Sequence, residues 1–566
     1  MEITINNKKI KCEQGETILD VAKREGIIIP SLCHHPDLPV KANCRICVVE
    51  IDGMEKLQTS CSTKVKDKMI IKTDTDKALK ARKMNLELIF AEHIEKCPDC
   101  IYNGRCKIQD LAEQYKIKID SRFQDRKRDR ATYNFGNAVN LDLSKCIDCQ
   151  NCVSACEMQQ ARFLEMSGKG YKSQISPTQD KERDCIYCGQ CAAHCPVGAA
   201  HENMEVEKVE KEIRELDRIV IAQIAPAIRV SIGEEFGLGN LGISTEQLAS
   251  AMRIIGFDIV FDTSVAADLT TIEEADELIE RLETGENLPM FTSCCPAWVK
   301  YVEFYHPELI PNLTTVRSPQ MILGGLAKTY FAKMKKIESD EICVVSIMPC
   351  TAKKFEAKRE DLKIENKMFP VDNVLTTREL GFLLKKYGIN PKKVSPEPLD
   401  SPLGEPSGAG IIYGAGGGVM LSVLRTAYFK LTGKDFPLDQ GSILRGDKGL
   451  KTGEIRINGR DIKFAAANGM RNAAIILNQL ETNPRSYDYV EIMACPGGCI
   501  GGGGQPVPTS EEIRARRAEA LFQLDRAKPI RFAHKNPQVL RIYEEFLIEE
   551  DAKHDLMYTK YRRRKK

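Results

Sequence analysis

The chain has 566 residues, too many for one ordinary domain, so three or four domains are expected. A formal net charge of +2 and an apolar fraction of 42% argue against bulk binding to nucleic acid or membranes. The N-terminal residues lack the pattern of a secretion signal, and no apolar run approaches a membrane span. We therefore expect a cytoplasmic protein with no membrane span and no nucleic-acid partner.

Twenty-two cysteines are the most informative part of the composition. The cytosol keeps thiols reduced, so metal binding is the default, with zinc and iron–sulfur clusters as the two candidates. Sixteen cysteines lie at or before Cys195 and the other six lie at or after Cys294. The chain therefore divides into a cysteine-dense N-terminal half and a C-terminal half of different character.

The first 75 residues predict a small β-rich domain. Two alternating segments, Glu2–Asn6 and Lys9–Cys12, flank a polar turn, and Glu16–Gly26 has the pattern of a short helix. Four cysteines follow with the spacing C-x10-C-x2-C-x13-C, namely Cys33, Cys44, Cys47 and Cys61. This differs from the plant ferredoxin spacing C-x4-C-x2-C. It is similar to the 2Fe–2S domain at the N-terminus of iron–sulfur hydrogenases and of the large iron–sulfur subunit of respiratory complex I.

A second motif follows a predicted helix over Asp74–His93. Its spacing is H-x3-C-x2-C-x5-C, with the residues His93, Cys97, Cys100 and Cys106. A zinc site with three cysteine ligands and one histidine ligand would fit these residues too. The same families carry a His-ligated 4Fe–4S cluster with this pattern, and that resemblance favours iron–sulfur. Imidazole in place of thiolate makes a cluster less negative and is expected to raise its reduction potential.

Residues 140–200 contain a repeated run, C-x2-C-x2-C-x3-C. This is the pattern of two-cluster ferredoxins, in which the fourth cysteine of each run ligates the other cluster. Zinc sites instead pair two C-x2-C knuckles. The repeat predicts two 4Fe–4S clusters, one held by Cys146, Cys149, Cys152 and Cys195, the other by Cys156, Cys185, Cys188 and Cys191.

Short apolar runs alternate with helical patterns in the second half, which is typical of parallel strands covered by helices on both faces. The runs are Arg218–Ile228, Phe257–Thr263, Leu288–Cys295, Ile342–Cys350, Asp372–Thr377 and Asp488–Cys495. Three runs end in cysteine: Cys294 with Cys295, Cys350, and Cys495. Because ligands collect beyond the carboxyl ends of such strands, we expect these cysteines to meet.

Three cysteine motifs of this half carry the closest resemblance. FTSCCPAW (291–298), MPCTAKKFE (348–356) and EIMACPGGCIGGGGQP (491–506) look like the three signature motifs of FeFe-hydrogenases. The N-terminal clusters match the same family, so the resemblance covers nearly the whole chain. It implies reversible conversion of protons and electrons into dihydrogen. It also implies an H-cluster, a 4Fe–4S cube joined to a two-iron unit with CO, cyanide and a dithiolate amine.

By this resemblance the cube is held by Cys295, Cys350, Cys495 and Cys499, with Cys499 as the bridge to the two-iron unit. Four soft thiolates at strand ends also favour an iron–sulfur site on chemical grounds. The glycines around Cys495 and Cys499 let backbone approach an inorganic cofactor closely. Cys294 is then the unligated neighbour. Free cysteines are usually small buried apolar residues, but the family pattern makes Cys294, with an ordinary pKa near ~8.5, a proton donor to the cofactor's amine.

A proton donor needs a supply from solvent. Glu274, Glu277 and Arg281 lie at i, i+3 and i+7 on one helical face, a pattern that is most often solvated surface charge. In the family the matching residues form the proton path, with a hydroxyl between the glutamates, here that of Thr314. Other matches surround the two-iron unit: Lys353, Gln320, Met348, Met493, Ala225 and Pro226. Ala227 stands where some ferredoxin-dependent members carry Ser.

The expected fold is α+β and multidomain. It comprises a β-grasp 2Fe–2S domain (1–75), a 4Fe–4S domain with one histidine and three cysteine ligands (76–137), a two-cluster ferredoxin-like domain (138–205), an α/β catalytic domain with parallel sheets flanked by helices (206–506) and a C-terminal helical extension (507–566). Cys12 and Cys343 are expected to be ordinary buried residues.

The electron partner is the least determined feature of the sequence. The glycine-rich stretch 408–420 lacks the acidic partner and the strand–turn–helix context of a dinucleotide fingerprint, so flavin or NAD(P) chemistry is expected on partner subunits. Ala227 and the complex I-like N-terminus favour an NAD(P)-linked, electron-bifurcating complex. The alternatives are a stand-alone ferredoxin-dependent hydrogenase and a non-catalytic sensor, electron-transfer or iron–sulfur assembly protein.

Overall fold

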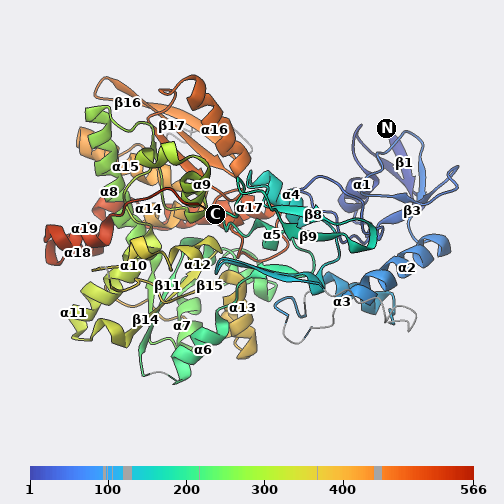
Figure 1. The fold of residues 1–566 in the computed structure, drawn as a ribbon, viewed down its shortest axis with the longest axis horizontal. Coiled ribbons are helices and arrows are strands. Elements are labelled where there is room, and N and C mark those ends of the chain that lie inside the picture. The colour runs from blue at the N-terminus through green and yellow to red at the C-terminus, as the bar shows by residue number, and fades with distance from the viewer. Residues whose placement is uncertain are drawn as a thin grey trace.

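The computed structural model describes residues 1–93, 97, 100–104, 106–118, 130–215, 217–365, 367–438 and 449–565. Within these ranges no helix combines the length and the apolar character needed to cross a membrane. The N-terminal sheet lies at one end of the elongated molecule and the C-terminal half at the other, with the cysteine-rich repeat between them (Figure 1).

The N-terminal domain is a five-stranded sheet of order β2-β1-β5-β3-β4. The elements are β1 (Glu2–Ile5), β2 (Lys8–Lys11), α1 (Ile18–Arg24), β3 (Val48–Ile51), β4 (Gln58–Thr59) and β5 (Ile70–Lys72). Thr17 caps α1 through a reciprocal hydrogen bond with Asp20, and the apolar face of α1 packs on the sheet. The predicted β-rich domain with one short helix is confirmed.

The middle of the chain is built from short elements around the cysteine motifs. Two helices come first and a three-stranded sheet of order β10-β7-β6 follows, together with the hairpin β8–β9. The bounds are α2 (Asp76–Glu92), α3 (Lys107–Gln114), β6 (Thr132–Phe135), β7 (Val139–Asp142), α4 (Asn151–Met158), β8 (Leu164–Ser167), β9 (Gln174–Pro177), α5 (Gln190–Ala193) and β10 (Ala200–Glu202).

The first sheet of the C-terminal half is parallel throughout, as predicted. Its order is β12-β11-β14-β15, and all neighbouring strands run in the same direction. The strands are β11 (Ile219–Ile224), β12 (Ile259–Asp262), β14 (Ile342–Met348) and β15 (Asn373–Thr376). Every residue of β14 is buried, as a central strand with helices on both faces requires.

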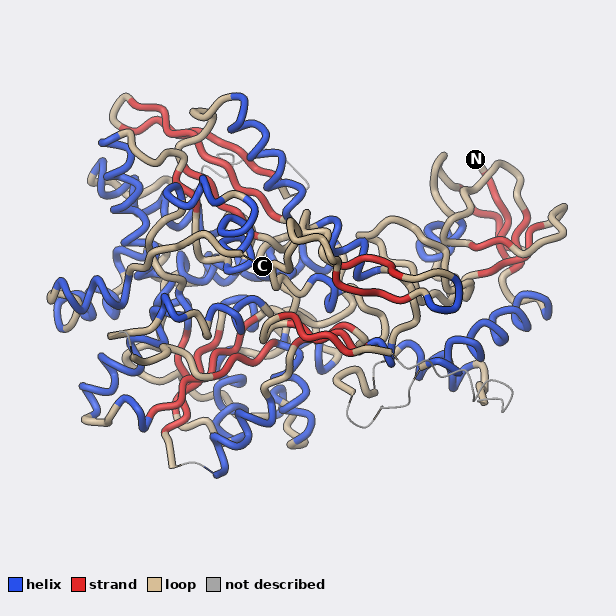
Figure 2. The backbone as a smooth tube through the Cα atoms, viewed as in Figure 1, coloured by secondary structure: helices blue, strands red, loops and turns tan. Residues whose placement is uncertain are grey.

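The second sheet corrects the expectation of purely parallel sheets. Its order is β13-β18-β17-β16, with β13 (Met290–Phe291), β16 (Leu450–Ile457), β17 (Arg460–Asn468) and β18 (Tyr489–Met493). β18 runs parallel to β13 and β17, whereas β16 and β17 form an antiparallel hairpin. The hairpin turns at Asn458 and Gly459, which both have positive φ, as tight two-residue turns require. Figure 2 shows the two sheets as separate groups of strands.

Helices surround both sheets. They are α6 (Val206–Glu215), α7 (Thr245–Ile255), α8 (Thr263–Thr284), α9 (Pro296–Tyr305), α10 (Pro319–Leu326), α11 (Ala332–Lys335), α12 (Ala352–Glu356), α13 (Thr377–Lys386), α14 (Gly408–Ile411), α15 (Gly418–Thr432) and α16 (Met470–Thr482). No strand leads into α14 or α15 in the described part of the chain, so the glycine-rich stretch lacks a dinucleotide fingerprint's context, as predicted.

Helix α8 connects the cores of the two sheets. Its N-terminal half packs Val265 and Leu269 with the first sheet, and its C-terminal half packs Ala275 and Leu278 with the second. Glu274 lies on the helix between the residues of the two hydrophobic cores, and its side chain is fully buried. The polar face predicted for this helix is therefore internal at Glu274, not solvated.

The C-terminal segment folds back over the two-sheet half of the molecule. Its helices are α17 (Glu511–Ala527), α18 (Pro537–Glu545) and α19 (Glu550–Met557), which pack on α14, α8 and α10 respectively. Beyond α19, Tyr558 pairs with Val316 in an antiparallel bridge. The C-terminus lies between the two lobes that contain the sheets (Figure 1).

Candidate active site and iron–sulfur relay

The four cysteines of the N-terminal motif lie together and are buried: Cys33, Cys44, Cys47 and Cys61. The backbone N–H of Cys44 donates to Cys33 Sγ at 3.5 Å. Hydrogen bonding with the Cys33 thiol lowers the pKa of Cys44, and Cys61 has the same effect on the pKa of Cys47. Four adjacent thiols of this kind fit a 2Fe–2S cluster.

His93 lines one small cavity together with the three cysteines of the second motif, Cys97, Cys100 and Cys106. His93 Nδ1 lies 3.0 Å from the carbonyl oxygen of Lys145. A metal-binding histidine commonly donates its second ring N–H to a backbone carbonyl, which leaves the other nitrogen for the metal. The geometry therefore fits ligation through Nε2.

The structure brings the repeated cysteines together crosswise. One cavity is lined by Cys146, Cys149, Cys152 and Cys195. Another is lined by Cys156, Cys185, Cys188 and Cys191. The fourth cysteine of each run thus lies with the first three of the other, which is the arrangement of two-cluster ferredoxins.

A cavity lies between the two sheets of the C-terminal half. The segments that follow β11, β13, β14 and β18 line it together with α10 and α12, through Ala225, Pro226, Ala227, Cys294, Gln320, Met348, Cys350, Lys353, Met493 and Cys499. All the residues that sequence reasoning placed around a two-iron unit therefore face one space. Its thioether, methyl and proline groups are apolar, while Lys353 and Gln320 supply the polar groups.

Four cysteines beside this cavity act on each other electrostatically. Burial, and then the charges of Cys350, Cys188, Cys295 and Cys499, raise the pKa of Cys495 well above its usual value. The backbone N–H of Ala494 donates to Cys295 Sγ at 3.5 Å, which ties the β13 end to the β18 end. Four buried thiols from three strand ends fit a 4Fe–4S cube, because iron lowers thiol pKa and satisfies sulfur that burial would otherwise keep protonated.

Lys353 and Gln320 share a buried carboxylate. Lys353 Nζ lies 2.7 Å from Glu356 Oε2 and donates to the carbonyl oxygen of Cys294 at 3.1 Å. Gln320 Nε2 donates to the same Oε2 at 3.0 Å, and its Oε1 is buried with no hydrogen-bond partner in the described part of the chain. These contacts fix both side chains at the cavity wall. The sequence did not indicate Glu356 as their anchor.

The predicted proton-path residues fall into two hydrogen-bonded groups. Thr314 Oγ1 donates to Glu277 Oε2 at 2.6 Å, and Arg281 Nη2 lies 2.5 Å from Glu277 Oε1. Deeper inside, Tyr489 donates its hydroxyl to Glu274 Oε2 at 3.1 Å. No direct bond joins Thr314 to Glu274 among the described residues, so the expected hydroxyl contact is present on the Glu277 side only.

Burial changes the acidity of both inner groups. Desolvation raises the pKa of Glu274 to about 8. Desolvation, followed by the charge of Glu274, raises the pKa of Cys294 well above its usual value. The ordinary thiol pKa expected from the sequence was therefore wrong, because Cys294 is buried beside a carboxyl group.

Several residues of the site were not found by sequence reasoning. Thr263, Pro319 and Tyr413 also line the cavity. Tyr413 lies in the glycine-rich stretch, and its hydroxyl is 2.8 Å from Thr271 Oγ1 on α8. Cys12 and Cys343, by contrast, line none of these cavities and are buried, as expected; Cys12 packs in the core of the N-terminal domain.

The cysteine-rich middle region docks directly on the loops that follow β14 and β18 and carry Cys350, Cys495 and Cys499. Gln190 Nε2 donates to the carbonyl oxygen of Gly501 at 2.9 Å, and Thr351 Oγ1 donates to that of Tyr187 at 2.7 Å. A Cβ on Gly503 would lie only 2.5 Å from the Cys188 carbonyl oxygen, so glycine is required there for the loops to meet.

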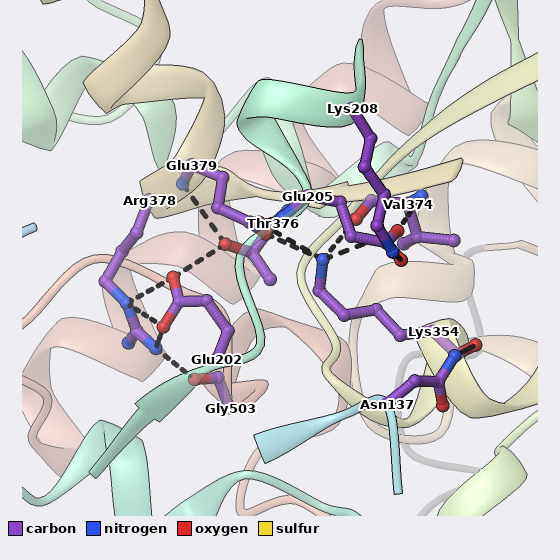
Figure 3. A network of polar contacts seen from close by, with 10 residues as sticks. All are labelled: Asn137, Glu202, Glu205, Lys208, Lys354, Val374, Thr376, Arg378, Glu379 and Gly503. Atoms are coloured by element: carbon purple, nitrogen blue, oxygen red, sulfur yellow. Dashed lines mark hydrogen bonds and ion pairs between the residues drawn. The ribbon is translucent and has the colours of Figure 1, made fainter. Parts of the chain in front are cut away.

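A buried ion-pair network reinforces this interface (Figure 3). Arg378 Nη2 lies 2.5 Å from Glu202 Oε2 and 2.7 Å from the Gly503 carbonyl oxygen. Thr376 Oγ1 donates to Glu202 Oε1 at 2.8 Å, and Lys354 Nζ lies 3.0 Å from Glu379 Oε2. The network joins β10 of the relay region to α12, α13 and the cube loop.

Comparisons with known families agree along the chain. Residues 218–503 match the model of the iron only hydrogenase large subunit, C-terminal domain. Residues 1–76 match a 2Fe–2S iron–sulfur cluster binding domain, 82–120 the NADH-ubiquinone oxidoreductase-G iron–sulfur binding region, 145–199 a 4Fe–4S dicluster domain, and 511–564 the iron hydrogenase small subunit.

Two curated relatives align over essentially their whole length. The NADP-reducing hydrogenase subunit HndD of Solidesulfovibrio fructosivorans is 37% identical over 100% of this chain and 99% of its own. Iron hydrogenase 1 of Clostridium pasteurianum is 34% identical over 99% and 100%. A solved structure of the apo [FeFe]-hydrogenase HydA1 from Chlamydomonas reinhardtii, a cysteine-to-histidine variant, covers 63% of this chain and 99% of its own, with 37% identity and a TM-score of 0.58.

The fold and the cysteine sites define an iron–sulfur oxidoreductase whose relay region is joined to a separate catalytic half. The chain belongs to the FeFe-hydrogenase family, as a catalytic subunit with N-terminal iron–sulfur domains.

Proposed function

We propose that this chain converts protons and electrons into dihydrogen, and the reverse, at an H-cluster held by Cys295, Cys350, Cys495 and Cys499. The observation that carries the proposal is the single cavity in which Cys294, Lys353, Gln320 and two methionines face Cys350 and Cys499. When bound, the cluster supplies the iron atoms at which hydrogen is formed or split and the amine that exchanges protons with the chain.

The chain's own residues provide the proton route in this proposal. Glu277, half-buried beside Arg281, takes a proton from solvent and passes it to Thr314 Oγ1, whose own proton moves toward Glu274. Glu274 then reprotonates Cys294 after the thiol has given its proton to the cofactor side. Glu274 Oε1 is buried without a partner among the described residues, so one bridging water there would complete the link to Cys294.

Electrons travel in the opposite half of the molecule. The charge of Cys44 contributes to the raised pKa of Cys149, that of Cys191 to the raised pKa of Cys152, and that of Cys188 to the raised pKa of Cys495. Burial is the largest cause of each raised pKa, and the smaller contributions from neighbouring charges indicate which cysteine sites lie next to each other. They support a relay from one 2Fe–2S cluster through two 4Fe–4S clusters to the cube. The third relay 4Fe–4S cluster, with His93 as a ligand, would lie beside this line, because Val197 lines both its cavity and that of Cys146.

The partner is proposed from the relative and from the N-terminal domains. HndD is named as a subunit of an NADP-reducing hydrogenase, and residues 82–120 match a region of NADH-ubiquinone oxidoreductase. Flavin and NAD(P) sites would then lie on partner subunits in an electron-bifurcating complex in the cytoplasm. A stand-alone enzyme that uses ferredoxin is the second candidate, because the same set of cysteine motifs would serve it too.

Hydrogen evolution from reduced methyl viologen, after full cofactor maturation, tests the catalytic proposal. Wild type is expected to be active and Cys294→Ser to lose at least about 100-fold, roughly the contribution of one positioned proton-transfer group. An inactive, fully loaded wild type would leave the alternative of a sensor or assembly protein, as the name of the Danio rerio relative, cytosolic Fe–S cluster assembly factor narfl, indicates for that protein. Equal activity of Cys294→Ser would refute only the role of this thiol.

A further inference from the structure

The two oxygens of the Glu274 carboxyl group have different surroundings. Oε2 accepts a hydrogen bond from the Tyr489 hydroxyl at 3.1 Å. Oε1 has no hydrogen-bond partner in the described part of the chain, although the side chain is fully buried. The carboxyl group is thus hydrogen-bonded through one oxygen only, so its two oxygens are not equivalent in proton transfer.

Tyr489 is placed by one of the most rigid parts of the fold. It lies on β18, between β13 and β17, in register with Met290 and Phe464. Its ring is fully buried in the core that packs α8 against the second sheet. The phenol therefore has no room to turn away from Glu274.

The same face of β18 connects this contact with the cofactor cavity. Residues at i, i+2 and i+4 of a strand share one face, here Tyr489, Glu491 and Met493. Glu491 accepts the backbone N–H groups of Gly417 and Met420 at the start of α15, and Met493 lines the cavity. One strand thus fixes Glu274, α15 and a cavity wall relative to each other.

We propose that Tyr489 is a positioning residue that keeps the transferable proton of Glu274 on Oε1. The inference rests on the proposed proton route through Glu274. Because the phenol donates to Oε2, Oε2 is the carbonyl oxygen of the neutral acid and Oε1 is the hydroxyl. In the transfer step the Oε1–H bond breaks, the proton passes through one bridging water to form the S–H bond of the Cys294 thiolate, and Glu274 is left as a carboxylate that Tyr489 stabilises while it keeps its own proton.

The surrounding charges agree with an acid that holds a proton at neutral pH. Desolvation raises the pKa of Glu274 to about 8, and the charges of Glu277 and Glu491 act in the same direction. The Tyr489 hydrogen bond and the charge of Arg281 act in the opposite direction. Tyr413, on the remaining side, is itself affected by the charge of Glu274. Without Tyr489, the neutral acid would lose its hydrogen-bond donor on Oε2 and could carry the proton on either oxygen.

Tyr489→Phe in the fully matured enzyme tests the proposal, with infrared spectroscopy and turnover as readouts. The C=O band of protonated Glu274, identified by its absence in Glu274→Gln, is expected to move to higher frequency because its acceptor bond is lost. Turnover is expected to fall about tenfold, the equivalent of one hydrogen bond of roughly 1.4 kcal/mol, with KM for reduced viologen unchanged. Tyr487→Phe is the matched control, since that hydroxyl binds Gln479 at the surface.

The outcomes separate this inference from the proposed function. An active Glu274→Gln would remove the proton route itself. An inactive Glu274→Gln together with an unchanged band and turnover in Tyr489→Phe would overturn the role of Tyr489 alone. If Tyr489→Phe fails to mature, 3-fluorotyrosine at position 489 keeps the ring and donates more strongly. It should then move the band to lower frequency, and an unmoved band would refute the contact.

Discussion

Cys294 and Glu274 illustrate how burial changes the acidity of ordinary side chains, here the two that the proposed proton route joins. Desolvation favours the neutral form of both, so each holds a proton at neutral pH and releases it only to a strong acceptor. Lys353 limits this effect on Cys294, since its ammonium group is among the charges that lower the thiol pKa. A group that keeps its proton until a base is generated beside it is suited to reversible transfer.

The raised pKa of Glu274 predicts a pH-dependent effect of Glu274→Gln on stability. Below pH 4.5 the glutamate is largely neutral in both folded and unfolded chains. As the pH rises toward 8, the unfolded chain ionises while the folded protein does not, so wild type loses stability. The amide cannot ionise. The Tm difference, variant minus wild type, should therefore grow between about pH 5 and 8 and then level off, at the equivalent of at most about 5 kcal/mol.

Glu283→Gln is the control for that measurement, because Glu283 lies exposed on the same helix. Differential scanning calorimetry of both variants across this pH range gives the comparison. A Tm difference that is flat with pH, or equal in the two variants, would contradict a buried acid at position 274.

The sequence identified the cysteines and the cavity residues but not the partners that fix them. Cysteine spacing is a local property, and the crosswise arrangement of Cys156 and Cys195 follows from it directly. Tyr489 and Tyr413 come from segments distant from α8, and only tertiary packing shows that they contact Glu274 and Thr271. Glu356 lies three residues after Lys353, and only the structure shows that the same carboxylate also holds Gln320.

Element by element, helical and strand periodicity predicted the first sheet well and the second only in part. The β16–β17 hairpin was missed, although Asn458-Gly459 between two alternating segments is a strong hairpin signal. Because β16 pairs antiparallel with β17, the second sheet contains both parallel and antiparallel strands, as sheets with an antiparallel edge strand often do. The burial of α8 was not predicted either. Its charged stripe is typical of a surface helix, but α10, α14, α15 and the C-terminal α18 pack around it.

The network around Arg378 predicts that the relay interface depends on Glu202. Both side chains are fully buried, so Glu202→Gln leaves the positive charge of Arg378 buried without the carboxylate that neutralises it. We expect a loss of about 3–5 kcal/mol, as for other broken buried pairs, measured as a lower Tm of the matured protein. Glu210→Gln is the control, because its partner Lys386 is about half exposed and should contribute less than about 1 kcal/mol. Equal effects of the two substitutions would show that the network does not stabilise the interface.

At the scale of the whole molecule, the proposed proton and electron routes reach the cavity through different parts of the chain. The proposed proton route follows α8 to Cys294, whereas the cysteine sites lead from the N-terminal sheet to Cys188, which adjoins the loop of Gly503 and Cys495. The two proposed routes meet only at the cavity. A substitution that blocks one route should therefore preserve any reaction that requires only the other route.

Cys156→Ser tests this separation. Cys156 lies with Cys185, Cys188 and Cys191, the site adjoining the cube, so its loss should disturb the last step of the relay. Exchange of deuterium between D2 and water requires proton movement at the cavity but no net electron flow. We expect viologen-linked hydrogen evolution to fall at least tenfold while isotope exchange, measured by mass spectrometry, stays within twofold of wild type.

Cys12→Ser, outside every cluster site, should leave both rates unchanged. A proportional loss of both rates in Cys156→Ser would mean that the relay site also supports the structure of the cavity, and the two routes would not be independent.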